Sequence, residues 1–287
     1  MVLVTGASGF IGKHVVEELV RDKQTLVCLV RNKNKYSFVG DEEVLECDLS
    51  DIELLKQTLK NREIDTCIHL AWEGIPDYSY EYSKKNLEMG MNVLEICKDL
   101  NISKLIITGS CWEYASPKGA ISTSYRVEYN NCFKAAKNSL HMMAHAFCND
   151  NDIKLNWLRL FYVYGVGQRE GSLIPHIIQS FKEGHQPELN GAYNENDFVN
   201  VRDVAKVIVE VAMCNERKEV LNVGMGEAVR VLDVVEEVAK QMDFTLDKEK
   251  YIFKEGASFY ADKAEMIKDG IKCEIDIRDG VREMIGA

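Results

Sequence analysis

Short apolar runs alternate with longer segments in which apolar residues recur every three or four positions through the first half of the chain. Nearly continuous apolar runs are typical of strands buried on both faces of a parallel sheet. The segments between them have the spacing of helices that cover such a sheet. The predicted strands span residues 2–5, 26–30, 44–47, 66–70, 105–109 and 155–160.

Beyond residue 165 the alternation is less regular. A loop containing Gly165, Gly167 and Gly171 leads into further elements. The pattern predicts helices over residues 173–182, 203–213, 231–242 and 279–285, and strands over 198–199 and 220–223. We therefore expect an α/β fold, a doubly wound parallel Rossmann sheet with a smaller C-terminal lobe.

Composition narrows the class of protein. The chain has 287 residues, 46% of them hydrophobic, and a formal net charge of −11. A length of this order fits one large core with a smaller lobe and argues against disorder. The acidic balance predicts no nucleic-acid partner and no anionic-membrane partner. We expect neither a transmembrane helix nor a basic leader at the N-terminus. Nine scattered cysteines without a CxxC pair favour a reducing, cytoplasmic location and no structural zinc site.

A glycine-rich turn follows the first predicted strand and begins the first predicted helix. Gly6 permits a tight turn, Gly9 permits close approach of a pyrophosphate, and Gly12 permits close packing of helix on strand. The helix N-terminus adds amide groups and a positive dipole end. This turn predicts a dinucleotide site that includes Ser8, Phe10 and Ile11.

The spacing of that turn is GxxGxxG, and several later motifs follow in order. They are Asp48-Leu49, His69-Leu70-Ala71, Asn86 with Asn92-Val93-Leu94-Glu95, Gly109-Ser110 with Tyr114, the segment 159–165, Asp197-Phe198-Val199 and Leu221-Asn222-Val223-Gly224. In this set the chain resembles the extended short-chain dehydrogenases/reductases, which are nucleotide-sugar epimerases, dehydratases and reductases.

The resemblance implies that Asp48, Leu49, Leu70, Ala71 and Tyr162 line the cofactor site. It also implies a homodimer and a nucleotide-sugar substrate. On this basis we assign residues 1–164, with 196–224 returning to them, to a dinucleotide-binding domain. Residues 165–195 and 225–287 are assigned to a substrate lobe.

The end of the second predicted strand bears on the choice of nicotinamide cofactor. An acidic residue there binds a ribose 2′-hydroxyl, whereas an arginine accommodates a 2′-phosphate. The strand is followed by Arg31, with Lys33 and Lys35 close behind, and no carboxylate lies between Gln24 and Gly40. We therefore favour NADP(H) over NAD(H), although a solvated basic loop has the same composition.

The resemblance also implies a catalytic group of Ser or Thr with Tyr-x-x-x-Lys. Ser110 and Lys137 match it, but Phe133 occupies the tyrosine position and cannot exchange a proton. Three explanations are open. An engineered Tyr→Phe change, which we favour, would preserve everything else seen here, because it removes a single oxygen. A natural variant would use another acid, with Cys132, Tyr125 or Tyr129 nearby. The third explanation is a non-catalytic regulator that binds NADP(H).

Candidate substrate contacts come from two segments. Trp72 and Glu73 follow the strand at 66–70, at the sheet edge where ligands bind, and Trp112 follows Ser110. By resemblance, Gln168 and Arg169 close over a nucleotide diphospho-sugar. Asn196 stands where the family commonly has an arginine, so Arg169, Arg202 or Arg230 would meet the diphosphate. Packing and surface positions are the ordinary alternatives for these residues.

These observations favour NADPH-dependent reduction of a nucleotide-linked 4-keto-6-deoxy sugar. An NAD-retaining epimerase or dehydratase is the alternative within enzymes, although Cys111-Trp112-Glu113 lacks the Asp-Glu pair of dehydratases. His141 and His145 lie four residues apart, but no glutamate follows His141 and we predict no metal site.

Overall fold

The computed structural model describes residues 1–214 and 218–287. These residues form two compact units, each assembled from separate stretches of the chain. Unit 1 contains Met1–Ala115, Tyr125–Arg159 and Ala205–Leu221. Unit 2 contains Ser116–Ser124, Leu160–Val204 and Asn222–Ala287.

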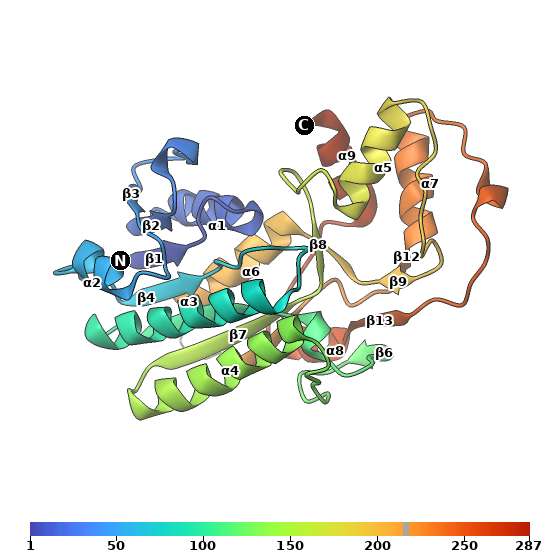
Figure 1. Cartoon of the computed structure of the whole chain (residues 1–287). Coiled ribbons are helices and arrows are strands. Elements are labelled where there is room, and N and C mark those ends of the chain that lie inside the picture. The colour runs from blue at the N-terminus through green and yellow to red at the C-terminus, as the bar shows by residue number, and fades with distance from the viewer. Residues whose placement is uncertain (215–217) are drawn as a thin grey trace. The chain divides into compact units, whose positions relative to one another are not determined.

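Seven strands form the central sheet, whose order is β11-β7-β5-β4-β1-β2-β3 (Figure 1). The pairs β1·β2, β1·β4, β2·β3 and β4·β5 are all parallel. The strands are β1 (Val2–Thr5), β2 (Leu26–Val30), β3 (Glu43–Glu46), β4 (Thr66–His69), β5 (Lys104–Ser110), β7 (Lys154–Leu160) and β11 (Val220–Val223). The strand order reverses between β1 and β4, which creates a crevice at the carboxyl ends of these strands. The predicted fold class is confirmed.

Helices cover the sheet on both faces. Figure 1 shows α3 (Tyr80–Asp99) and α4 (Cys132–Asp150) on one face, with α1 (Phe10–Arg21) and α6 (Val201–Met213) on the other. The short helix α2 (Ile52–Leu59) contacts α3. A β-carbon at Gly90 of α3 would lie 2.6 Å from both terminal methyl groups of Leu140 in α4, so glycine permits this close helix packing. On α4 the neighbouring Met142 and Met143 are exposed.

Unit 2 has its own sheets and core. A four-stranded sheet has the order β12-β9-β13-β6, and β8 pairs with β10. These strands are β6 (Gly119–Ile121), β8 (Tyr162–Tyr164), β9 (Glu195–Asn196), β10 (Phe198–Asn200), β12 (Val229–Arg230) and β13 (Ser258–Ala261). The helices are α5 (Leu173–Lys182), α7 (Val231–Gln241), α8 (Lys263–Lys268) and α9 (Ile277–Gly286). Buried apolar residues from α5, α7 and α9 share one hydrophobic core.

Inside this unit, the Asp197 carboxylate lies fully buried. It accepts hydrogen bonds from the backbone N–H groups of Met225, Gly226 and Ala261. Burial raises the pKa of Asp197 to about 6, while these three donors oppose the shift. The carboxylate therefore connects three separate chain segments of unit 2.

Several boundaries differ from the sequence prediction. The strands of the central sheet match to within one residue at each end, but the two- and three-residue strands of unit 2 were not all anticipated. The units also divide the chain differently, because residues 116–124, 160–164, 196–204 and 222–224 belong to unit 2. Such short strands contain too few residues for a periodic pattern. The assignment of the units to cofactor and substrate stays a prediction.

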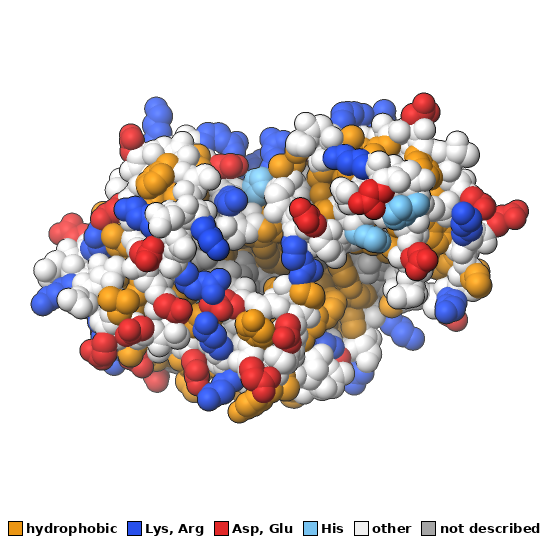
Figure 2. Space-filling view, turned by 45° about the horizontal axis from the view of Figure 1, so that its top comes forward, with side chains coloured by type: hydrophobic (Ala, Val, Ile, Leu, Met, Phe, Trp, Pro, Cys, Tyr) orange, Lys and Arg blue, Asp and Glu red, His pale blue; other side chains and the backbone are white. Residues whose placement is uncertain are grey.

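The surface mixes charges of both signs. Figure 2 shows Lys and Arg side chains interspersed with Asp and Glu over the visible face. None of the helices among residues 1–214 and 218–287 has the length and hydropathy needed to cross a bilayer.

Candidate active site

The glycine-rich turn lies between β1 and α1, at the carboxyl edge of the sheet. Gly6 has a φ of +71°, and a β-carbon there would lie 2.7 Å from the backbone nitrogen of Ala71. A β-carbon at Gly12 would lie 2.1 Å from the Gly6 carbonyl oxygen. The N-cap of α1 is Gly9, and no side chain caps the helix. The turn therefore presents backbone amides at a helix N-terminus, as pyrophosphate binding requires.

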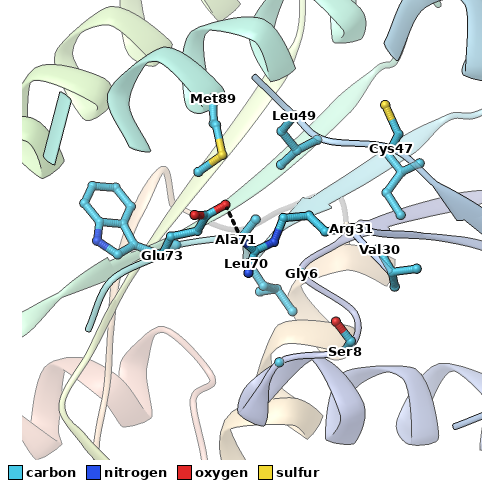
Figure 3. Close-up of a pocket in the computed structure, with 13 residues that line it drawn as sticks. Gly6, Ser8, Val30, Arg31, Cys47, Leu49, Leu70, Ala71, Glu73 and Met89 are labelled. Atoms are coloured by element: carbon cyan, nitrogen blue, oxygen red, sulfur yellow. Dashed lines mark ion pairs between the residues drawn. The ribbon is translucent and has the colours of Figure 1, made fainter. Parts of the chain in front are cut away.

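A pocket opens beside this turn (Figure 3). Seven of the predicted cofactor residues line it, and so do Trp72 and Glu73, which we had predicted as sugar contacts. The pocket is lined by Gly6, Ser8, Gly9, Leu29, Val30, Arg31, Cys47, Leu49, Leu70, Ala71, Trp72, Glu73 and Met89. Sequence reasoning missed Leu29, Val30, Cys47 and Met89. The first three lie at the ends of predicted strands next to the crevice, which is the signal that would have found them.

Arg31 and Glu73 are the charged residues in that lining. The Arg31 Nη1 lies 3.0 Å from the Glu73 Oε1, and the Lys85 Nζ lies 3.0 Å from the Glu73 Oε2. Figure 3 shows the Arg31 and Glu73 side chains directed toward each other. We call Arg31, Glu73 and Lys85, with Asn86, the Glu73 cluster.

Asp48, which was predicted to line the cofactor site, follows β3 but is not among the residues that line the pocket. Its carboxylate accepts hydrogen bonds from the backbone N–H and the hydroxyl of Ser50, at 2.9 and 2.7 Å. These bonds hold the pKa of Asp48 below its usual value, with smaller contributions from the positive charges of Lys85 and Arg31. The carboxylate is therefore ionised at neutral pH.

Phe133 lies at the start of α4 and is buried. Its ring centroid lies 5.1 Å from that of Tyr78, 5.6 Å from that of Trp72 and 6.3 Å from that of Trp112. We call these four residues the aromatic cluster. Trp72 and Trp112, predicted as sugar contacts, therefore contact the residue at the missing tyrosine position.

Lys137 lies one turn after Phe133 on α4, also buried. Its Nζ donates a hydrogen bond of 2.7 Å to the Thr108 carbonyl oxygen and lies 3.7 Å from the centroid of the Trp72 ring. Burial lowers the pKa of Lys137 to about 7, and the negative charge of Glu113 opposes this shift. The amine thus lies next to the aromatic cluster with a pKa near neutrality.

The residues considered as alternative proton donors, Tyr125, Tyr129 and Cys132, have surroundings that differ from those of Phe133. Tyr125 packs edge-on against Tyr114, with ring centroids 6.0 Å apart. Tyr129 is 60% exposed, and Cys132 is exposed as well. Tyr78, which contacts Phe133, follows the cis Ile75–Pro76 peptide bond in the loop after β4.

Ser110 ends β5 and begins the 3₁₀ helix η2 (Cys111–Glu113). Its backbone N–H donates to the Glu113 Oε1 at 2.7 Å, and its hydroxyl oxygen accepts from the Trp112 N–H at 3.2 Å. The Glu113 side chain is fully buried and also accepts from Trp157 Nε1 and from Arg159 Nε, the latter at 2.8 Å.

Arg159 also belongs to the buried group of side chains around Glu113. Its Nη1 donates to the Tyr114 hydroxyl oxygen at 3.2 Å. Burial opposes ionisation, yet the Glu113 carboxylate raises the pKa of Arg159 above its ordinary value. We call Glu113, Tyr114, Trp157 and Arg159 the Glu113 cluster. It fixes the turn that carries Ser110.

His69 lies at the end of β4, on the strand next to β1. Its Nδ1 lies 2.7 Å from the Thr5 hydroxyl oxygen, and its Nε2 is buried without a hydrogen-bond partner among the described residues. Burial, with a contribution from Lys137, lowers the pKa of His69 to about 3. The ring is therefore neutral at physiological pH.

The predicted contacts at the substrate end belong to unit 2. Gln168 donates from Nε2 to the Val163 carbonyl oxygen at 3.0 Å, and its Oε1 is buried without a hydrogen-bond partner among the described residues. Arg202 pairs with Glu283 at 2.5 Å, and Arg230 pairs with Asp233. Asn196 belongs to β9, and Arg169 is exposed. Tyr162, which was predicted as a cofactor residue, belongs to β8 of unit 2 and is not among the residues that line the pocket beside the glycine-rich turn.

His141 and His145 both face Glu219, at 3.1 and 2.7 Å. The His141 ring also stacks on Trp157, with centroids 4.7 Å apart. Across the part of the chain that the structure describes, no group of three or more His, Cys, Asp or Glu side chains is arranged to hold a metal ion.

Comparison with known proteins identifies the family. Residues 2–224 match the model of the NAD dependent epimerase/dehydratase family. The chain is 26% identical to CDP-abequose synthase of Salmonella typhimurium, over 99% of this chain and 97% of that protein. It is 23% identical to dTDP-6-deoxy-L-talose 4-dehydrogenase (NAD(+)) of Aggregatibacter actinomycetemcomitans, over 87% of this chain and 93% of that protein.

Among solved structures, MoeE5 in complex with UDP-glucuronic acid and NAD superposes with a TM-score of 0.86. That likeness has 28% identity and covers 99% of this chain and 97% of the other. The family model covers most of the sequence, and the relatives match nearly its full length. The chain belongs to the NAD dependent epimerase/dehydratase family, within the extended short-chain dehydrogenases/reductases.

Proposed function

We propose that this chain has the site of an NADPH-dependent reductase for a nucleotide-linked 4-keto-6-deoxy sugar, with its proton donor removed at Phe133. The observation that carries the proposal is the arrangement around Lys137. The buried amine, Ser110 on its fixed turn and a ring in the tyrosine position are all retained, and one phenolic oxygen is missing. The name of one relative, dTDP-6-deoxy-L-talose 4-dehydrogenase (NAD(+)), supports chemistry at the sugar C4 position, and a second relative, CDP-abequose synthase, is also named for a nucleotide sugar.

The residues of the turn fit a dinucleotide, because α1, whose N-cap is Gly9, begins without a side-chain cap and its first backbone N–H groups can bind a pyrophosphate. Gly6, Ser8, Gly9, Leu49, Leu70 and Ala71 would hold the dinucleotide. When bound, the nicotinamide supplies hydride for the reduction. Arg31 at the end of β2 supports NADP(H), although MoeE5 was solved with NAD.

The protein groups have separate tasks. The Ser110 hydroxyl would donate a hydrogen bond to the sugar's keto oxygen and stabilise the charge that develops there. Lys137 would orient the cofactor and place a positive charge near the proton donor. Phe133 fills the tyrosine's volume but holds no proton for that oxygen. Glu113 is committed to buried hydrogen bonds, which disfavours a dehydratase role for it.

The Phe133→Tyr variant tests the proposal. With NADPH and a panel of nucleotide-linked 4-keto-6-deoxy sugars, we expect kcat to rise by a factor on the order of 10²–10⁴ over the chain with Phe133, because a positioned general acid contributes about that much. Phe133→Leu serves as the control, since it changes the ring without adding a hydroxyl. If the Phe133→Tyr protein binds NADPH and substrate but stays inactive, the proposal is wrong.

An NAD-retaining epimerase is the second candidate, favoured by the NAD and UDP-sugar bound to MoeE5. Mass spectrometry of the cofactor released on denaturation separates the two candidates. Tightly held NAD supports the epimerase, and exchangeable NADPH supports the reductase. The homodimer remains a prediction, which light scattering tests directly.

A further inference from the structure

Glu73 places a carboxylate in the pocket, although no acidic residue lies between Gln24 and Gly40 around the end of β2. Its side chain is 12% exposed and pairs with two cations at 3.0 Å, one through each oxygen. Arg31 comes from the end of β2 and Lys85 from α3. The carboxylate therefore connects the segment after β2 to the segment after β4 (Figure 3).

The backbone of Glu73 is fixed independently of these ion pairs. Its N–H donates to the Asn86 Oδ1 at 2.7 Å, and its carbonyl oxygen accepts from the Asn86 Nδ2 at 3.0 Å. Asn86 is itself buried, and its Nδ2 also donates to the Tyr82 carbonyl oxygen at 2.7 Å. The carboxylate therefore projects into the pocket from an anchored residue, and its removal leaves the anchor intact.

Arg31 is the cation at the position where a 2′-phosphate is distinguished from a 2′-hydroxyl. Its side chain is 61% exposed, so an anionic ligand can reach the guanidinium. In the present arrangement that guanidinium already has a carboxylate partner. A 2′-phosphate would have to displace the Glu73 carboxylate or share Arg31 with it, against the repulsion of two like charges. A 2′-hydroxyl carries no charge and meets no such competition.

We infer that Glu73 is a cofactor-specificity residue, which weakens binding of a dinucleotide with a 2′-phosphate by competing for Arg31. The inference rests on the cofactor use proposed above, and it concerns the ratio of the two affinities.

The test measures dissociation constants for NADP⁺ and NAD⁺ by isothermal titration calorimetry on the full chain. The two ligands differ by the 2′-phosphate alone. The variants are Glu73→Gln, Arg31→Ala and the double variant, compared with the unmodified chain. Glu88→Gln is the matched control, because Glu88 is exposed on α3, pairs with Lys84 at 3.5 Å and lies outside the pocket lining. It changes the net charge by the same amount.

We expect Glu73→Gln to tighten NADP⁺ binding about five- to tenfold, since an accessible ion pair and one nearby repulsion are removed. NAD⁺ binding changes by about twofold or less. The gain for NADP⁺ disappears in the Arg31→Ala background, and Glu88→Gln gives none. The same melting temperature for Glu73→Gln and the unmodified chain shows that the anchor on Asn86 survives.

Equal changes for both cofactors, no change in NADP⁺ affinity, or a gain that persists without Arg31 would each overturn the inference. Absence of binding by either cofactor would overturn it as well. Failure of the sugar reduction leaves these binding constants unaffected. A chain that prefers NAD⁺ contradicts the proposed use of NADPH, while the change caused by Glu73→Gln still decides the role of Glu73.

Discussion

Two of the glutamate–arginine ion pairs in unit 1 lie in very different surroundings. In the Glu113 cluster a glutamate and an arginine are both buried and share further hydrogen bonds with Trp157, Tyr114 and the Ser110 backbone. In the Glu73 cluster the arginine is largely exposed, and the pair lines a pocket.

Burial decides whether an ion pair holds its surroundings in place or can exchange one partner for another. Breaking a buried pair leaves a charge without solvent or partner, so the pair is fixed and the turn that it holds is fixed with it. An accessible pair exchanges its partner for water or an anion at little cost. The first arrangement suits the positioning of Ser110, and the second suits a site that must admit a charged ligand.

Glu113→Ala should produce the largest effect on stability. It leaves the buried Arg159 guanidinium without its carboxylate, and we expect the free energy of unfolding to fall by about 3–5 kcal/mol. Urea denaturation followed by tryptophan fluorescence measures the loss. A loss below about 1 kcal/mol would mean that the buried pair behaves like the exposed one.

Lys137 extends the comparison of buried and accessible charges to a single buried amine, which forms no short ion pair with Glu113. Its pKa is about 7 in the folded chain and ordinarily 10.5. Between these values the unfolded chain binds more protons, so stability should rise as pH increases from about 7 to about 10. Lys137→Met should remove this part of the slope, as measured by denaturation at several pH values. Parallel pH profiles for the two proteins would contradict the assignment.

Arg159→Lys separates the effect of charge from that of hydrogen-bond geometry within the Glu113 cluster. Lysine keeps the charge but cannot bond Glu113 and Tyr114 with the geometry of a guanidinium. We expect a loss of about 1–2 kcal/mol, smaller than for Glu113→Ala because the buried carboxylate keeps a cation nearby. Thermal melting of both variants gives the order, and a reversed order would show that hydrogen bonds outweigh charge here.

Glu73→Gln should have the smallest effect on folding. The cations of its two ion pairs, Arg31 and Lys85, are both accessible to solvent. Removal of these pairs should therefore change the free energy of unfolding by only about 0.5 kcal/mol. Denaturation in the absence of cofactor checks this value, with Glu88→Gln alongside. A loss comparable to that of Arg159→Lys would place Glu73 among the structural residues of unit 1.

The sequence predicted the central sheet well because its strands are continuous apolar runs between helices of clear period. The first strand, Val2–Thr5, and the glycine turn after it required only local chemistry. Seven cofactor residues of the pocket lining were predicted, some from the glycine turn and the end of the second strand and the others, Leu49, Leu70 and Ala71, from the family resemblance.

The sequence could not predict which partners the charged residues choose. Glu73 and Arg31 lie 42 positions apart, and nothing local to either indicates the other. Glu113 reads as an ordinary polar residue after Trp112, yet it is fully buried because Trp157 and Arg159 arrive from β7. The contact between Tyr78 and Phe133 likewise depends on a loop and a helix brought together by the fold.

The chain's three tryptophans are Trp72, Trp112 and Trp157, and all belong to unit 1. Trp72 and Trp112 contact Phe133, and the Lys137 amine also lies over the Trp72 ring. Trp157 donates a hydrogen bond to Glu113. Indole emission from this protein thus reports on the surroundings of Phe133, Lys137 and Glu113 in unit 1. Unit 2 contains no tryptophan, so its unfolding must be followed through its tyrosines by another spectroscopy.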